Sequence, residues 1–143
     1  MTFSLHERLA ADTILIGSLP LCELLLMNDA RFPWCVLVPR RTGMRDIIDL
    51  APADAETLFH ESLALQRALR NAFAPDKLNV AAIGNLVPQL HVHHIARYTG
   101  DSEWPAPVWG RGTPLAYDPL VRTQRIVALR DRLGDILQGN DRR

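Results

Sequence analysis

The chain has 143 residues, its 16 lysines and arginines balance 16 aspartates and glutamates, and 48% of its residues are hydrophobic. This length suits one domain with one core, and the near-average composition excludes a disordered chain, a collagen-like repeat and a coiled-coil rod. A formal net charge of zero supplies no basic surface for nucleic acid or an anionic membrane. We therefore expect a single domain over residues 1–143 that binds neither nucleic acid nor a membrane.

The N-terminal residues and the two cysteines indicate the cell compartment. Met1–Arg8 lacks the basic start and long apolar run of a secretory signal, and no apolar run reaches the roughly 18 residues that span a bilayer. Cys22 and Cys35 lie in apolar runs, where a buried thiol is expected rather than a disulfide scaffold. These features predict a cytoplasmic protein.

The first half of the chain is predicted to form a short helix, three strands and a long helix. Ser4–Glu7 has the pattern of a capping box that opens a helix ending near Ala11. From about residue 53, apolar residues recur every three or four positions, which predicts an amphipathic helix of about five turns. Between these helices, runs of strand-forming residues predict strands at Thr13–Gly17, Cys22–Met27 and Cys35–Pro39.

The second half is predicted to form two strands, an irregular segment and a final helix. Residues 77–84 and 89–97 have the pattern of two strands connected by 85–88. The proline-rich and tryptophan-rich segment 99–119 is predicted to be an ordered loop. Asp118 and Pro119 supply an N-cap and a first-turn proline for a C-terminal helix over about 119–138. A frayed tail follows at 140–143, so the whole is predicted to be α+β, mostly antiparallel sheet with helices on one face.

Residues 87–97 carry the most informative pattern, because alternate side chains of a strand point to opposite faces. Leu90, Val92 and Ala96 are predicted to face the helix-covered core, and His94 falls on that apolar side. The side chains predicted for the other face are Gln89, His91, His93 and Arg97. We expect the His91 ring to face open solvent beside His93.

Two adjacent imidazoles can divide two chemical roles. An ordinary imidazole titrates near pH 6.5, so one ring can act as a nucleophile while its neighbour donates a hydrogen bond, which suits a phosphate. The alternatives are two histidines without a role, or a chance metal pair. A zinc site would need further ligands, and the remaining histidines are His6, His60 and His94, without a Cys-x-x-Cys pair. We predict no metal site.

Val87–Arg97 reads VPQLHVHHIAR and resembles the signature of the histidine triad (HIT) superfamily, His-φ-His-φ-His-φ-φ with φ hydrophobic. Lys77–Asn85, Trp104–Trp109 and Pro33–Pro39 resemble further segments of a bacterial branch of that family. The resemblance covers about residues 5–110. It departs from the pattern at Gln89, which takes the place of the first histidine, and at His94, where an apolar residue is usual.

The resemblance implies a five-stranded antiparallel α+β fold that pairs as a homodimer and binds a nucleotide across the triad strand, without a cofactor. It implies that His91 attacks the α-phosphorus and forms a covalent nucleotidyl-histidine, which water hydrolyses. It also implies that His93 hydrogen-bonds the phosphate oxygens. Gln89 occupies the remaining catalytic position, and glutamine keeps a donor and an acceptor but cannot exchange a proton near neutral pH.

Three further residues are expected to bind the nucleotide. The resemblance places Asn28 at the ribose and Asn85 at the phosphate or the leaving group. Arg97 either aids phosphate binding or ends the strand in solvent. Trp104 and Trp109 are expected to pack against the protein body.

Three functions remain open from the sequence. The first is a nucleotidyl hydrolase or transferase acting on a dinucleoside polyphosphate, a nucleoside phosphoramidate or an acyl nucleotide. The second is a nucleotide-binding module with weak catalysis. The third is a metal-binding protein that uses His91 and His93.

Overall fold

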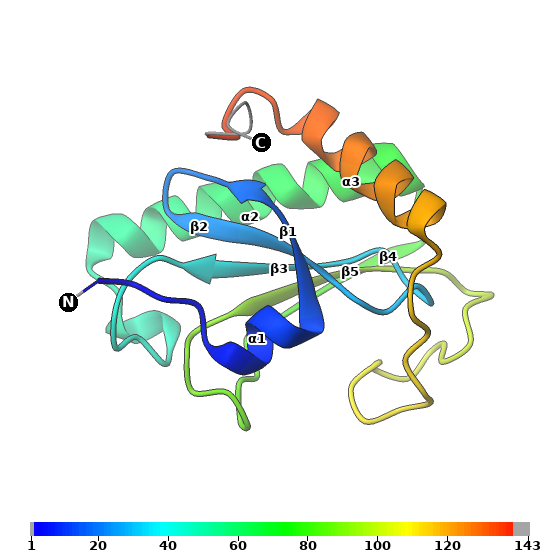
Figure 1. Cartoon of the computed structure of the whole chain (residues 1–143), viewed down its shortest axis with the longest axis horizontal. Helices are drawn as coiled ribbons and strands as arrows, with labels where there is room; N and C mark the ends of the chain where they lie inside the picture. The colour runs from blue at the N-terminus through cyan, green and yellow to red at the C-terminus, as the bar shows by residue number, and fades with distance from the viewer. Residues whose placement is uncertain (1, 139–143) are drawn as a thin grey trace.

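A five-stranded antiparallel sheet with strand order β1-β2-β3-β5-β4 organises the computed structural model, which describes residues 2–138 (Figure 1). This confirms the predicted α+β fold class. The single domain predicted over 1–143 extends beyond the described residues at both ends. The tail predicted at 140–143 lies outside them. The strands are β1 (Thr13–Ser18), β2 (Cys22–Met27), β3 (Trp34–Pro39), β4 (Lys77–Ala81) and β5 (Val92–Arg97), and the helices are α1 (Glu7–Asp12), η1 (Ile47–Asp49, a 3-10 helix), α2 (Pro52–Phe73) and α3 (Pro119–Arg132).

Both faces of the sheet are covered. The two long helices, α2 and α3, lie on one face, as predicted, and the short α1 lies on the other (Figure 1). Leu24 and Leu37 face α2, whereas Leu25 and Val36 pack on the opposite side with Leu9 of α1. This arrangement explains why β3 is buried along its whole length and reads as a continuous apolar run.

Helix α2 closely follows its predicted periodicity. It begins at Pro52 and ends before Ala74, whose positive φ of 46° stops the helix. Its buried Glu61 accepts hydrogen bonds from the backbone N–H groups of Leu21 and Cys22 at 2.6 and 3.0 Å. This carboxylate fixes α2 to the turn between β1 and β2, where the two amides would otherwise be buried without partners.

The connection between β4 and β5 is longer than predicted. The predicted strands 77–84 and 89–97 shorten to 77–81 and 92–97, because the ladders end at the pairs Ala81–His93 and Leu37–Val92. Gly84 has a positive φ of 48°, and Pro88 has no N–H to donate, so neither residue continues a strand. Gln89 and His91 therefore lie in a loop that leads into β5.

The terminal helices also differ from their predicted bounds. Helix α1 begins at Glu7 with His6 as its N-cap, since the His6 ring accepts a hydrogen bond from the Arg8 amide. Helix α3 begins after the Asp118 cap as predicted but ends at Arg132. Turns follow at 133–136, and Gln138 forms an isolated β-bridge with Ser18. The segment 99–118 is irregular, as predicted.

The two cysteines are free and buried, as predicted. Burial raises the pKa of the Cys35 thiol to about 12 and also raises the pKa of Cys22, so both thiols stay protonated at neutral pH. No helix within residues 2–138 combines the length and apolarity needed to cross a membrane.

His94 faces α2, on the side that the alternation predicts. Its Nδ1 donates to the Val92 carbonyl at 3.0 Å, so the neutral ring accepts at Nε2 from the Ser62 hydroxyl at 2.7 Å. Ser62 in turn accepts from Gln66. Burial lowers the pKa of His94 to about 4. The ring is therefore a neutral, fully hydrogen-bonded part of the core at neutral pH.

This neutral histidine predicts a loss of stability in mild acid. The His94 pKa is near 6.5 in an unfolded chain and about 4 in the fold, so below pH 6.5 the unfolded state binds a proton that the native state does not. The free energy of unfolding should fall as the pH drops from 6.5 to 4, and urea denaturation at each pH measures it.

Two variants assign this pH dependence. His94→Asn should make the slope between pH 6.5 and 4 shallower, whereas His60→Asn, on the exposed surface of α2, should leave it unchanged. An unaltered slope in the His94 variant would show that this ring is not the group that titrates.

Candidate active site

His91 and His93 lie side by side where β5 begins, with ring centroids 5.1 Å apart. Each residue is only 6% exposed, so the expectation that His91 faces open solvent is wrong. Trp34 and Trp109 pack edge-on against the His93 ring, with centroids 5.7 and 5.4 Å away. Both imidazoles nevertheless line a cavity, so they border a pocket and do not lie in the closed interior.

A backbone carbonyl determines the tautomer of His91. Its Nδ1 lies 2.7 Å from the carbonyl oxygen of Gln89. Because a carbonyl oxygen only accepts hydrogen bonds, Nδ1 must carry the proton. In the neutral ring the lone pair is then on Nε2, which is the nitrogen available as a nucleophile.

The opposite tautomer is imposed on His93. The indole N–H of Trp34 donates to its Nδ1 at 3.0 Å, and an indole nitrogen can only donate. The proton of His93 is therefore on Nε2. Burial, followed by the nearby His91 and His94, lowers the pKa of His93 to about 3, so the ring stays neutral and offers an N–H donor at neutral pH.

Two cavities border these rings, and a third adjoins the central one. The central one, about 360 Å³, is lined mainly by apolar and aromatic side chains, and it includes His91 and His93. A second cavity of about 210 Å³ shares His91 and Asn85 with the first and adds Arg45 and Asp46. A third, about 250 Å³, shares Trp34 with the central cavity and adds Asn28. His91 thus lines both an apolar and a polar cavity, and His93 lines only the apolar one.

Gln89 does not line these three cavities, although its place in the motif predicted a catalytic role. Its side-chain oxygen accepts from the His6 amide at 2.8 Å, and its side-chain nitrogen donates to the Ser4 carbonyl at 2.9 Å. Both ends of the amide are occupied by the backbone that leads into α1. Gln89 therefore positions the N-terminal segment. The N-cap of α1 is His6, so the capping box predicted at Ser4 is wrong.

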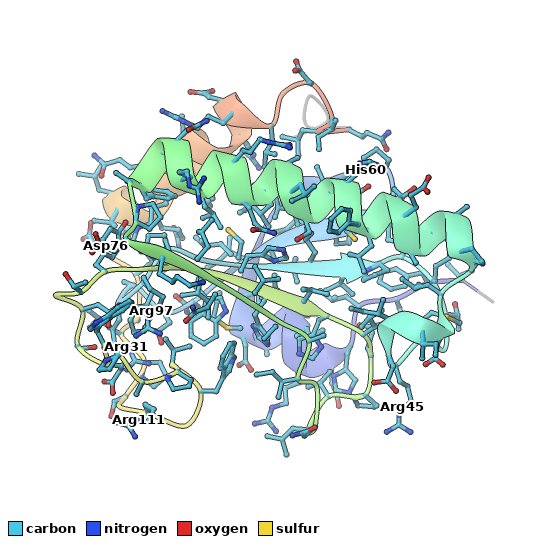
Figure 2. All side chains as sticks on the ribbon, turned by 180° about the vertical axis from the view of Figure 1, so that it is seen from behind. Arg31, Arg45, His60, Asp76, Arg97 and Arg111 are labelled. Atoms are coloured by element: carbon cyan, nitrogen blue, oxygen red, sulfur yellow. The ribbon has the colours of Figure 1, made fainter. Side chains whose placement is uncertain are left out.

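Arg97 is not placed as a phosphate-binding residue or as a solvent-exposed strand end. The residue is 1% exposed, and its guanidinium bonds Asp101 at 2.8 Å and Asn79 at 3.0 Å. Phe32 and Trp104 pack over it. Figure 2 shows Arg97 far from Arg45, toward the opposite end of β5. Its charge is used inside the structure, which corrects the expected nucleotide-binding role.

The two asparagines lie on the cavity walls. Asn28, after β2, is exposed and accepts one long hydrogen bond from the Tyr117 amide at 3.4 Å. Asn85, in the loop before β5, is exposed and lines both cavities that meet at His91. Their positions leave both side chains open to a ligand.

The motif did not single out the other cavity residues. Trp34 falls inside a segment that resembles the family, but only the folded sheet shows that its indole reaches His93. Trp109 packs against Trp34, as predicted, and also lines the central cavity. Arg8 and Asp12 line that cavity from α1, and their contribution depends on how the helix docks, which no local pattern indicates.

Among residues 2–138, no three side chains of His, Cys, Asp or Glu come together as a metal site requires. His91 and His93 form only a pair, and the Nδ1 atom of each already has a protein partner. These residues do not supply the three or four ligands of a zinc centre.

Comparisons with known proteins identify the family. The sequence model of the HIT domain matches residues 8–100. A histidine triad protein from Bradyrhizobium japonicum is 52% identical over 92% of this chain and 98% of its own, with a TM-score of 0.91. The histidine triad proteins of Marinobacter aquaeolei (47%, covering 95% and 99%, TM-score 0.92) and Sinorhizobium meliloti (42%, covering 92% and 98%, TM-score 0.90) are similar throughout. The search of curated proteins found no match. The chain belongs to the histidine triad (HIT) family.

Proposed function

We propose that this chain is a nucleotidyl hydrolase or transferase that acts on nucleoside phosphate derivatives through a covalent intermediate on His91. One observation carries the proposal: protein partners hold two neighbouring rings, with centroids 5.1 Å apart, in opposite tautomers, so that His91 has a lone pair on Nε2 and His93 has an N–H on Nε2. A nucleophile beside a hydrogen-bond donor is the arrangement that attack on a phosphate needs.

The cavities suggest how a nucleotide binds. The apolar central cavity, with Trp34 and Trp109 on its walls, suits a nucleobase, since aromatic rings stack on bases. Asn28 and Asp12, which line the adjoining cavity, supply polar groups for the ribose hydroxyls. The α-phosphate would then lie at the two histidines.

The reaction follows from the tautomers. The Nε2 lone pair of His91 attacks the α-phosphorus, a P–N bond forms, and the bond from phosphorus to the leaving group breaks with its electron pair on the leaving group. His93 donates its N–H to a phosphoryl oxygen. The His91 ring becomes cationic while it keeps the Nδ1 proton, and the Gln89 carbonyl, 2.7 Å away, stabilises that charge.

Water completes the cycle. It attacks the phosphorus of the nucleotidyl-histidine, and the P–N bond breaks with its electron pair returning to Nε2. One proton of the water passes to the solvent, and the nucleoside monophosphate is released. If another acceptor replaces water, the same intermediate transfers the nucleotidyl group.

Trapping the intermediate tests this proposal. After incubation with diadenosine triphosphate and rapid quenching, peptide mass spectrometry should find an adenylyl group on the peptide that contains His91. The His91→Ala variant should form no adduct and lose about 1,000-fold or more in kcat, because the nucleophile is gone.

His60 is an exposed histidine on α2. The His60→Ala variant is therefore the matched control, and it should keep full activity. Saturable binding of AMP with turnover unchanged in His91→Ala would instead identify a nucleotide-binding module. Activity that depends on stoichiometric metal bound to His91 and His93 would favour a metal-binding protein.

Gln89 should act on substrate binding and not on proton transfer, because its amide bonds only the segment that leads into α1. Gln89→Ala removes two hydrogen bonds that hold the helix carrying Arg8 and Asp12. It should raise KM about 10-fold and change kcat little in steady-state kinetics. Gln124→Ala, exposed on α3, is the control.

A second variant separates the two possible roles of this position. Gln89→His restores the usual first residue of the motif. If Gln89 only positions the N-terminal segment, Gln89→His will not raise kcat. A faster variant would show that the glutamine limits proton transfer, and the positioning role would be wrong.

A further inference from the structure

We propose, on the basis of the function above, that this chain selects substrates whose leaving group departs as an oxyanion, such as a phosphate or a polyphosphate, over substrates that release an amine. The polar cavity beside His91, with Arg45 on its wall, would interact with that anionic leaving group. Two independent observations support this inference: the proton donors at the site and the charges of the polar cavity.

Among residues 2–138, no side chain that lines the cavities at His91 acts as a general acid. The titratable side chains that line them within the described residues are Arg8, Asp12, Arg45, Asp46 and His93, besides His91 itself. An arginine does not give up its proton, and a carboxylate as an anion only accepts. Neutral His93 offers a hydrogen bond through its Nε2–H but holds that proton tightly. Gln89, at the remaining triad position, bonds Ser4 and His6 and has no acidic proton.

This shortage discriminates between leaving groups. When the P–O bond to a phosphate or polyphosphate breaks, the electron pair stays on oxygen as a stable anion, and no proton is required. When a P–N bond to an amine breaks, the nitrogen must gain a proton to leave. A general acid contributes about 100-fold to 10,000-fold to such a step, and none of the described residues that line these cavities provides it.

The polar cavity supplies charge for an anion. Arg45 is exposed on its wall, and no ion pair of its guanidinium is found within residues 2–138. Figure 2 shows Arg45 projecting from the ribbon. Asn85, on the same wall, adds an amide donor. Asp46 also lines this cavity, so the two neighbouring residues carry opposite charges and should have opposite effects on an anionic leaving group.

The experiment compares two substrates that share the same adenosine 5′-phosphoryl group. Diadenosine triphosphate releases ADP, and adenosine 5′-phosphoramidate releases ammonia. The ratio of kcat/KM for the triphosphate to kcat/KM for the phosphoramidate should be about 100 or more at pH 7.5. Because the transferred adenosine 5′-phosphoryl group is the same, its recognition cancels in the ratio.

Two neighbouring variants of opposite charge test the cavity. Arg45→Gln should lower the ratio about 10-fold, since a hydrogen bond to a charged group is lost, and Asp46→Asn should raise it. Arg70→Gln, exposed on α2 and outside these cavities, should not change it. A ratio that responds to neither Arg45 nor Asp46 would overturn the role of this cavity.

The outcomes distinguish this inference from the proposed function. Equal or faster turnover of the phosphoramidate, with an adenylyl group on His91, would overturn the leaving-group preference and leave the nucleotidyl mechanism intact. If neither substrate is turned over and no adduct forms on His91, the proposed function is wrong and this inference is wrong with it.

Discussion

The site depends on two hydrogen bonds that hold neighbouring imidazoles in opposite tautomers. The Gln89 carbonyl holds the proton of His91 on Nδ1, and the Trp34 indole forces the proton of His93 onto Nε2. Without these partners, each neutral ring could carry its proton on either nitrogen, and the proposed nucleophile and hydrogen-bond donor would not be distinguished. The geometry is thus prepared before a substrate arrives, which would reduce the reorganisation that the proposed reaction requires.

The sheet provides the rigidity that these bonds need. Trp34 and His93 lie on paired strands, β3 and β5, and both strands are buried on two faces. On the opposite face, His94 is fixed by Ser62 of α2, and at the far end of β5 the buried Arg97 pairs with Asp101. Consecutive polar residues of one strand therefore have different roles, because alternation sends them to different surroundings.

Much of this organisation could be predicted from the sequence, because it depends on local patterns. Apolar runs indicated the first three strands, the period of α2 was clear, and alternation separated His94 from His93. Contacts between distant segments could not be predicted. The hydrogen bonds of Gln89 to Ser4 and His6 join residues more than eighty positions apart. The burial of Arg97 depends on the loop that follows β5 and supplies Asp101. The residues of 89–97 were typical of an exposed strand face, and they gave no sign that Trp109 would pack against the His93 ring.

The most direct measurement of the central claim is the tautomeric state of each ring, observed by long-range ¹H–¹⁵N NMR of histidine-labelled protein at neutral pH. The account predicts a protonated Nδ1 and an unprotonated Nε2 for His91, and the reverse for His93. The Trp34→Phe variant should release the His93 preference and leave His91 unchanged. A proton on Nε2 of His91 in the native protein would remove the nucleophile and contradict the account.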